Sequence, residues 1–312
     1  MEINNKDISV VIQGAVDREL TETAIKSIRA YLPGATIIIS TWKGEEVSSL
    51  DVDELVLNED PGCSPRSSIS KKPKMNNVNR QIVSSLNGLK SSKTKFSLKM
   101  RTDFIVTGKG FVEAFGKYND YNSEKYKVFS SRIICCMVGT RKPVGVNYSL
   151  PFHVSDFSAF GLTEDLLKLY DIPLATEDEF KFFDNHPEIE RKTFATNRYN
   201  AEQTIWVNCL RSNNKLVDLD HSTHLSNENV IESDRFLVNN FHPLSFKKYG
   251  VSPMKCELKR MFSNPKIYTD YYTEHEWMML YKKHCSENVD IPLLDLERLL
   301  IKLKCKMSRK KV

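Results

Sequence analysis

The sequence predicts an α/β fold in which a mostly parallel sheet is flanked by helices. Short apolar runs rich in β-branched residues alternate with helical patterns over the first hundred residues. Such continuous apolar strands are typical of parallel sheets covered on both faces. The composition, with 40% hydrophobic and 27% charged residues, is that of a globular protein. The 312 residues fit one large α/β domain with a modest appendage.

The elements of the first half are predicted in order along the chain. Strands are expected at 8–13, 35–40, 54–58 and 96–100. A helix is expected at 21–32, closed by Pro33 and Gly34. A second helix is expected after Asn76 or Asn77, either of which can cap it, with its apolar face running from Val78 to Leu89.

The second half is predicted to be less regular. Short strand-like pieces occupy 120–160, helices are expected at 163–170 and 201–210, and 213–255 reads as loop with short strands. The chain is expected to be mostly helical from 276 onward. No clean linker is visible, so we predict an α/β domain at 1–255 and a helical C-terminal region with a basic tail at 256–312.

The net charge of +5 is concentrated at the C-terminus. Residues 302–312 contain six Lys or Arg and no acid, and removing six from 45 leaves 39 basic against 40 acidic residues, a net of −1 over 1–301. A neutral body argues against a nucleic-acid-binding surface. The amphipathic stretch 291–307 with this tail predicts either docking on an anionic inner-leaflet membrane surface or a helix packed on the core with a frayed basic end.

Several classes of protein are disfavoured by missing patterns. The N-terminus shows no signal peptide, and no apolar run approaches the roughly 20 residues that span a bilayer, so a cytoplasmic protein is expected. The seven cysteines include no Cys-x-x-Cys pair and are expected to be reduced thiols. Neither a Gly-x-Gly-x-x-Gly fingerprint after the first strand nor a phosphate-binding ATPase loop is present.

Polar residues follow the predicted strands at the edge where ligands bind in open parallel sheets. They are Gln13-Gly14, Thr41-Trp42, Asp60-Pro61-Gly62 and Arg101-Thr102-Asp103. A glycine that admits a ligand, an aromatic ring that stacks on a base or sugar, and a cation beside a carboxylate together outline a nucleotide or sugar site. The alternatives stay open: a mere turn at Gly14, a sheet-edge cover at Trp42, and a surface ion pair among Lys99, Arg101 and Asp103.

The ordered set of motifs resembles the WavE family of lipopolysaccharide synthesis proteins over about residues 8–210. The matching segments are ISVVIQGAV (8–16), SIRAYLPGATIIISTWKG (27–44), VLNEDPG (56–62), NVNRQIVSSLNGLK (77–90), FSLKMRTDFIV (96–106), FHVSDFSAFGL (152–162) and RYNAEQTIW (198–206). The resemblance implies a glycosyltransferase-like protein with the A-type (Rossmann-like) nucleotide-diphospho-sugar fold.

That fold usually carries an Asp-x-Asp element, whose carboxylates hold a divalent cation that neutralises the leaving diphosphate. Here the position reads Arg101-Thr102-Asp103, so the first Asp is replaced by Arg. Either Asp103 holds Mn²⁺ or Mg²⁺ with help from His224 or His242, or Arg101 itself binds the phosphates. We expect metal assistance.

The resemblance also implies positions for the donor and for a general base. The predicted donor-binding residues are Gln13, Gly14, Thr41, Trp42, Asn79, Arg80, Lys99, Arg101 and Asp103. Asn79 and Arg80 are expected at a helix N-terminus, where a diphosphate is favoured. An inverting transfer needs a carboxylate to deprotonate the acceptor hydroxyl, and Asp156 and then Glu202 are the candidates.

The preferred prediction is a glycosyltransferase that moves a sugar from a nucleotide-sugar donor to a lipopolysaccharide, capsule or related bacterial surface glycan. It would be cytoplasmic and peripheral on the inner face of the membrane. The alternatives are a nucleotidyl- or phosphoglycosyl-type transferase on the same sheet, and a non-catalytic nucleotide- or glycan-binding subunit of an assembly complex.

Overall fold

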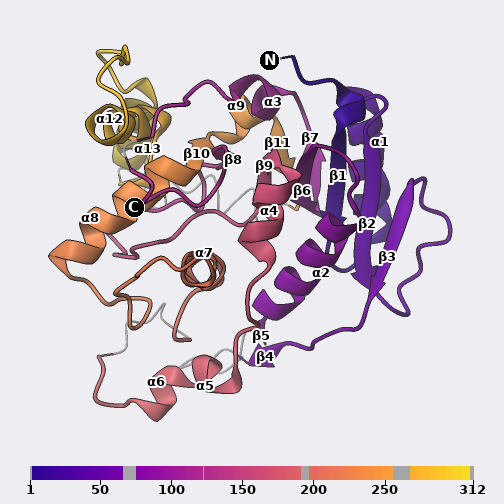
Figure 1. Ribbon diagram of the computed structural model, residues 1–312, viewed down its shortest axis with the longest axis horizontal. Helices are drawn as coiled ribbons and strands as arrows, with labels where there is room; N and C mark the ends of the chain where they lie inside the picture. The colour runs from indigo at the N-terminus through magenta and orange to yellow at the C-terminus, as the bar shows by residue number, and fades with distance from the viewer. Residues whose placement is uncertain (1, 66–74, 122, 191–196, 256–267, 310–312) are drawn as a thin grey trace.

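The computed structural model describes residues 2–65, 75–121, 123–190, 197–255 and 268–309. A seven-stranded sheet lies at its centre, in the order β10-β8-β9-β6-β1-β2-β3 (Figure 1). The strands are β1 (Ile8–Gln13), β2 (Thr36–Trp42), β3 (Glu54–Asn58), β6 (Phe96–Arg101), β8 (Ile133–Cys136), β9 (Ser158–Leu162) and β10 (Phe241–Leu244). Only β9 runs antiparallel to its neighbours in this sheet. The predicted α/β class with a mostly parallel sheet is confirmed.

Helices cover both faces of the sheet because the central strands are apolar on both sides. Along β1, Val10 and Ile12 pack with α1 (Arg18–Tyr31), while Val11 packs on the other face with α2 (Val78–Ser91). A side chain at Gly88 of α2 would place its Cβ 2.5 Å from Val11, so this glycine lets the helix lie close against the sheet. The close approach fixes the N-terminus of α2 beside the carboxyl ends of β1 and β2.

The remaining elements are short or belong to the second half. They are η1 (Asn5–Asp7), β4 (Ser64–Pro65), β5 (Met75–Asn76), β7 (Phe104–Val106), α3 (Gly110–Ala114), α4 (Thr163–Tyr170), α5 (Glu177–Phe180), α6 (Phe182–Asn185), α7 (Ala201–Ser212), α8 (Asn227–Asn240), α9 (Phe246–Tyr249), β11 (Val251–Pro253), α12 (Glu274–His284) and α13 (Leu296–Arg309). β7 and β11 form a separate antiparallel pair.

The prediction of loop with short strands at 213–255 is wrong over 227–240, where the 14-residue helix α8 lies. The Ser226 side chain accepts a hydrogen bond from the Asn229 backbone, and the Asn229 side chain accepts one from Ser226 in return. This capping box starts the helix. Asn and Ser replace apolar residues on much of the buried face of α8, which hid its periodicity.

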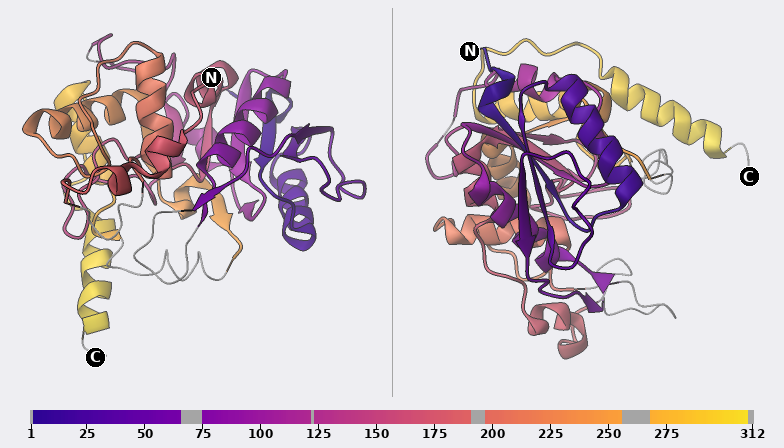
Figure 2. Two further views of the ribbon diagram at one scale, coloured as in Figure 1. Left: turned by 90° about the horizontal axis from the view of Figure 1, so that it is seen from below. Right: turned by 90° about the vertical axis from the view of Figure 1, so that its right-hand side faces the viewer.

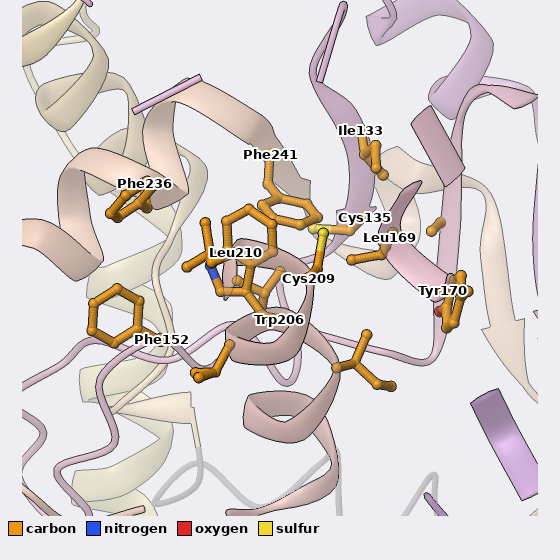
Figure 3. Packing of buried hydrophobic residues seen from close by; sticks show 14 of the residues in the cluster. Ile133, Cys135, Phe152, Leu169, Tyr170, Trp206, Cys209, Leu210, Phe236 and Phe241 are labelled. Carbon is orange, nitrogen blue, oxygen red and sulfur yellow. The ribbon is translucent and has the colours of Figure 1, made fainter. Parts of the chain in front are cut away.

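The larger hydrophobic core joins the sheet to the second half of the chain. Figure 3 shows Trp206 of α7 against Phe241 of β10, with Phe236 of α8 and Cys209 nearby. The Trp206 and Phe241 rings meet edge to face, with centroids 4.7 Å apart. Trp277 of α12 is fully buried in the same core. The helix α12 is therefore packed on the α/β body.

The C-terminal part is helical, as predicted. In both views of Figure 2, α13 extends away from the body of the molecule toward the C-terminus. Leu296, Leu299, Leu300 and Leu303 are exposed along this helix, whereas Ile301 is buried. Within the described part of the chain, no helix combines the length and apolar character needed to cross a membrane.

Candidate functional site

A cleft of about 290 Å³ opens at the carboxyl ends of β1 and β6, beside the N-terminus of α2. Its walls are formed by Gln13, Gly14, Ala15, Trp42, Asn77, Arg80, Gln81, Arg101, Thr102, Asp103 and Lys255. This is the edge where an open parallel sheet places its ligands. Six of the predicted donor-binding residues are brought together here: Gln13, Gly14, Trp42, Arg80, Arg101 and Asp103.

The backbone after β1 forms one wall of the cleft. Gly14 has a φ of +112°, which only glycine adopts without strain, and its N–H donates to the Ser40 carbonyl. Thr102 donates from its hydroxyl to the Ala15 carbonyl at 2.8 Å. The first bond joins the end of β1 to β2, and the second ties the turns that follow β1 and β6 to each other. The wall at Gly14 therefore carries no side chain, and a ligand can approach its backbone.

Arg101 and Asp103 form a two-pronged ion pair. The Arg101 guanidinium donates from Nε and Nη2 to the two Asp103 carboxylate oxygens, at 2.8 and 2.7 Å. Lys255 adds a second cation, with its Nζ 3.3 Å from Asp103 Oδ2. Burial alone would raise the pKa of Asp103, but the hydrogen bond and charge of Arg101 outweigh burial and hold that pKa below its usual value. Asp103 is thus an ionised residue that holds two cations at the cleft.

Arg80 is positioned in a similar way on the opposite wall. Its Nε donates to Asp60 Oδ1 at 2.7 Å, and its Nη1 donates to Asn77 at 3.4 Å. The hydrogen bond with Arg80 lowers the pKa of Asp60. Asp60 follows β3, so two strand-end carboxylates each fix one arginine. Among the described residues, the cleft walls carry Arg80, Arg101 and Lys255 against one carboxylate, that of Asp103.

The remaining predicted wall residues are largely covered. Trp42 is 7% exposed and Gln13 is 5% exposed. The Gln13 side-chain oxygen accepts a hydrogen bond from Ser84 of α2 at 2.7 Å. Trp42 therefore borders the cleft with a limited part of its ring.

Beneath the cleft lies a buried lysine. Lys99 is fully buried in β6, and its Nζ donates to the Asp156 carbonyl at 2.6 Å and lies 5.3 Å from the Tyr170 ring centre. Burial lowers the pKa of Lys99 to about 8. Gln81, which lines the cleft, donates to the same carbonyl at 3.1 Å. Asp156 is in this way joined to the cleft wall through Gln81.

Asp156 and Glu202 are electrostatic neighbours although they are far apart in sequence. Burial, together with the charge of Glu202, raises the pKa of Asp156 to about 6. Glu202 lies in the first turn of α7, and its Oε2 is 3.6 Å from His153 Nε2. Burial lowers the pKa of His153 to about 3, so this imidazole is neutral, and its Nδ1 donates to the Gly139 carbonyl. A carboxylate whose pKa lies near neutrality is suited to proton transfer.

Other predicted site residues lie outside the cleft. Thr41 is fully buried in β2. The Asn79 side chain exchanges two hydrogen bonds with the backbone of Ala175 and so holds the chain before α5. His224 accepts a hydrogen bond from the Asp220 backbone in the loop before α8, and His242 is buried against Trp277.

The residues do not fit a preformed divalent-cation site. Both Asp103 oxygens are committed to Arg101, and one of them also to Lys255. Over the described ranges, no three His, Cys, Asp or Glu side chains are grouped so that they could hold a metal ion. This geometry fits phosphate binding by Arg101 better than a metal held by Asp103 with help from His224 or His242.

Three polar wall residues are absent from the sequence-based prediction of the site: Asn77, Gln81 and Lys255. Arg80 and Gln81 follow Asn77 by three and four residues, so the helix period could have placed both beside Asn77 at the start of the helix. Lys255 reaches the cleft because β11 pairs with β7 and because the Met254 N–H donates to the Asp103 carbonyl. No local pattern predicts that pairing.

The chain belongs to the WavE lipopolysaccharide synthesis family, whose model matches residues 8–310. The family resemblance noted in the sequence is confirmed. No protein of curated function matches the sequence. Among solved structures, a similar one is 4-diphosphocytidyl-2C-methyl-D-erythritol synthase from Anaerococcus prevotii. It shares 12% identity at a TM-score of 0.34, and the alignment covers 74% of this chain and 97% of that chain.

Proposed function

We propose that this protein is a glycosyltransferase that moves a sugar from a nucleotide-sugar donor to a lipopolysaccharide, capsule or related surface glycan. The observation that carries the proposal is the cleft at the ends of β1 and β6. Its walls combine three cations with one ion-paired carboxylate, and a carboxylate of raised pKa lies beneath them. The family's link to lipopolysaccharide synthesis supports the choice of acceptor.

The donor diphosphate would lie between Arg80 and Arg101. Two of the three guanidinium nitrogens of Arg101 face Asp103, and the arginine is held rigidly by that pair. A fixed guanidinium binds phosphate oxygens with directed, charge-assisted hydrogen bonds. Lys255 and Arg80 add charge that would stabilise the departing nucleoside diphosphate. This cationic wall performs the task assigned to a metal in enzymes with a complete Asp-x-Asp element.

Asp156 is the preferred general base. With a pKa of about 6, most of its carboxyl is ionised at pH 7, yet it binds a proton more readily than an ordinary aspartate. The negative charge of Glu202 adds to the effect of burial and raises the pKa of Asp156. Glu202 can do this without touching the acceptor itself. Lys99 fixes the Asp156 backbone from below.

The exposed face of α13 supports peripheral membrane attachment. Leu296, Leu299, Leu300 and Leu303 follow a three/four spacing, and the helix continues into the basic C-terminal sequence. Leucines on one face beside a run of Lys and Arg are suited to an anionic lipid surface. Such attachment would bring the cleft to a lipid-linked acceptor.

Thermal-shift and turnover measurements with nucleotide sugars test the activity. The full chain is screened against nucleotides and nucleotide sugars with EDTA or with Mn²⁺, and the released product is identified. Glycosyl transfer predicts stabilisation by a nucleotide sugar and release of a nucleoside diphosphate. Release of pyrophosphate would instead indicate a nucleotidyltransferase. Binding without any turnover would indicate a non-catalytic subunit.

Vesicle co-sedimentation tests the membrane role separately. The change Leu300→Ser with Leu303→Ser should release the protein from vesicles that contain phosphatidylglycerol, with turnover of a water-soluble acceptor unchanged. Removal of residues 302–312 should have the same effect. Equal sedimentation of all three proteins would contradict membrane attachment.

A further inference from the structure

A second cavity, of about 520 Å³, lies at the β10 edge of the sheet and shares no wall residue with the cleft. Its walls come from the start of α3, the strand β10, the helix α9 and the first residue of α12. Figure 1 shows α3 and α9 side by side close to β10. The lining residues that matter here are Lys109, Lys117, Lys247, Lys248, Glu113 and Glu274.

The charge of this cavity is positive. Four lysines face two glutamates, which gives a net charge of +2 among the ionised wall residues. Lys248 is ion-paired with Glu274, and Lys109 donates to Asn5 at 3.3 Å. Lys117 and Lys247 are exposed side chains that reach the cavity from two different segments, after α3 and within α9. A lysine ammonium is a compact charge that suits phosphate oxygens.

A buried imidazole also lines the cavity. His242 of β10 is 2% exposed, and neither of its ring nitrogens has a hydrogen-bond partner among the residues that the structure describes. Its ring stacks on Trp277 and meets Tyr118 edge to face, with centroids 4.4 and 5.0 Å away. Burial, together with Arg132 and Lys117, lowers the pKa of His242 to about 3, so the ring is neutral. Buried polar atoms are nearly always paired, and an unpaired one therefore needs an explanation.

We propose that this cavity is a second binding site, for a phosphate monoester that also carries hydroxyl groups, such as a phosphorylated sugar. Its lysines match the charge of a phosphate dianion. A neutral imidazole has one N–H donor and one acceptor nitrogen. The donor suits a phosphate oxygen and the acceptor suits a hydroxyl group. The cavity is larger than the donor cleft, so it has room for a sugar as well as the phosphate.

This site does not depend on the proposed function of the cleft. The cleft is at the central strands β1 and β6, whereas the cavity is at the outermost strand on the β10 side. The same phosphate chemistry is present in a free sugar phosphate, in a phosphorylated unit of a glycan and in a lipid headgroup. The experiment therefore includes probes for the soluble and the lipid sources.

Calorimetric titration of the full chain with glucose 1-phosphate and with inorganic phosphate tests the proposal. In the variant K117A with K247A, glucose 1-phosphate should bind at least tenfold more weakly, because two charge-assisted contacts are lost. The variant Lys26→Ala with Lys93→Ala removes the same charge from exposed sites elsewhere and should bind as the parent does. The affinity of the cleft for a nucleotide sugar should be unchanged in both double variants.

Two further variants locate the ligand. His242→Phe keeps an aromatic ring on Trp277 and removes both nitrogens, so it should weaken glucose 1-phosphate more than inorganic phosphate. Arg101→Ala should weaken nucleotide binding and leave glucose 1-phosphate binding unchanged. To test a lipid source of the phosphate, binding of the parent and of the lysine variant to vesicles of phosphatidylglycerol with phosphatidic acid is measured.

Three results would contradict a sugar-phosphate site in this cavity. The proposal is overturned if the parent protein does not bind glucose 1-phosphate. It is also overturned if the lysine variant binds glucose 1-phosphate normally, or if Arg101→Ala abolishes all phosphate binding. Loss of vesicle binding in the lysine variant, without glucose 1-phosphate binding by the parent, would assign the cavity to a lipid headgroup instead.

Discussion

Two aspartates, one in the wall of the cleft and one beneath it, have pKa values that are shifted in opposite directions. Asp103 lies among cations, and its pKa is held below the usual value. Asp156 is half-buried, and loss of solvent together with the charge of Glu202 raises its pKa to about 6. The first carboxylate fixes Arg101 and Lys255, and the second is suited to accept a proton. Two carboxylates whose environments separate their pKa values are the usual sign of a divided acid-base role.

Under the proposed function, Arg101 would supply the positive charge that a metal supplies where the Asp-x-Asp element is complete. Asp103 holds this arginine in position. The positive charge is therefore part of the protein chain itself. Three substitutions, which give four expected effects, test these separate roles of Arg101 and Asp156, from the largest effect to the smallest.

Asp156→Asn should have the largest effect. The amide keeps the shape of the side chain but cannot accept a proton, so kcat should fall by about 10²–10⁴-fold with donor affinity unchanged. Steady-state kinetics and calorimetry on one preparation measure both quantities. A variant that keeps full turnover would show that Asp156 is not the base, and Glu202→Gln would then be tested in the same assay.

Arg101→Ala should weaken binding of the nucleotide sugar by about 30- to 100-fold, because a charge-assisted pair with the diphosphate is lost. Arg101→Lys is the matched control and should recover part of the affinity, since it restores the charge without the planar fork. Equal affinities for the parent and the alanine variant would separate Arg101 from the donor site.

Asp156→Asn should also stabilise the folded protein. The pKa of Asp156 rises from 3.8 in the unfolded chain to about 6 in the folded protein. The free energy of unfolding therefore decreases as the pH rises through that range, because the folded state has to give up a proton that it binds more tightly. At pH 7.5 the asparagine variant should therefore unfold with a free energy about 1–2 kcal/mol higher than the parent. Below pH 4 the difference should vanish. Urea unfolding at both pH values measures this effect, and an unchanged stability at pH 7.5 would contradict the raised pKa.

Lys99→Met should have the smallest effect. The charge of Lys99 lowers the pKa of Asp156, so its removal should shift the acidic limb of the pH-rate profile from near pH 6 upward by about half to one pH unit. Turnover at pH 8 should change little. A profile that does not move would mean that Lys99 only fills space in the core.

Much of the fold and half of the site followed from local patterns. The bounds of β1 and β3 match the predicted strands, and the residues after β1 and β6 line the cleft. Apolar strands in an α/β fold direct their polar ends to one edge, so this part needed no tertiary information. Asn79 was predicted in the cleft, but its side chain bonds to Ala175 instead. The sequence left Asn76 or Asn77 as the cap, and a helix start that is uncertain by one residue does not fix which way the first-turn side chains point.

Tertiary effects account for what was missed. Lys255 reaches Asp103 through the β7-β11 pairing, which joins segments far apart in the chain. His224 and His242 were considered as ligands by residue type, but their surroundings differ: a loop hydrogen bond for one and an aromatic stack for the other. The raised pKa of Asp156 depends on burial and on Glu202, and neither is visible in a local pattern.

The most direct test of the central claim is calorimetric binding of a panel of nucleotide sugars in EDTA, with the parent protein and Arg101→Ala side by side. The account predicts that at least one nucleotide sugar binds the parent in EDTA and that the alanine variant loses most of that affinity. Binding that requires Mn²⁺ and is unaffected by the Arg101 change would contradict the proposal that Arg101 and its neighbouring cations hold the diphosphate.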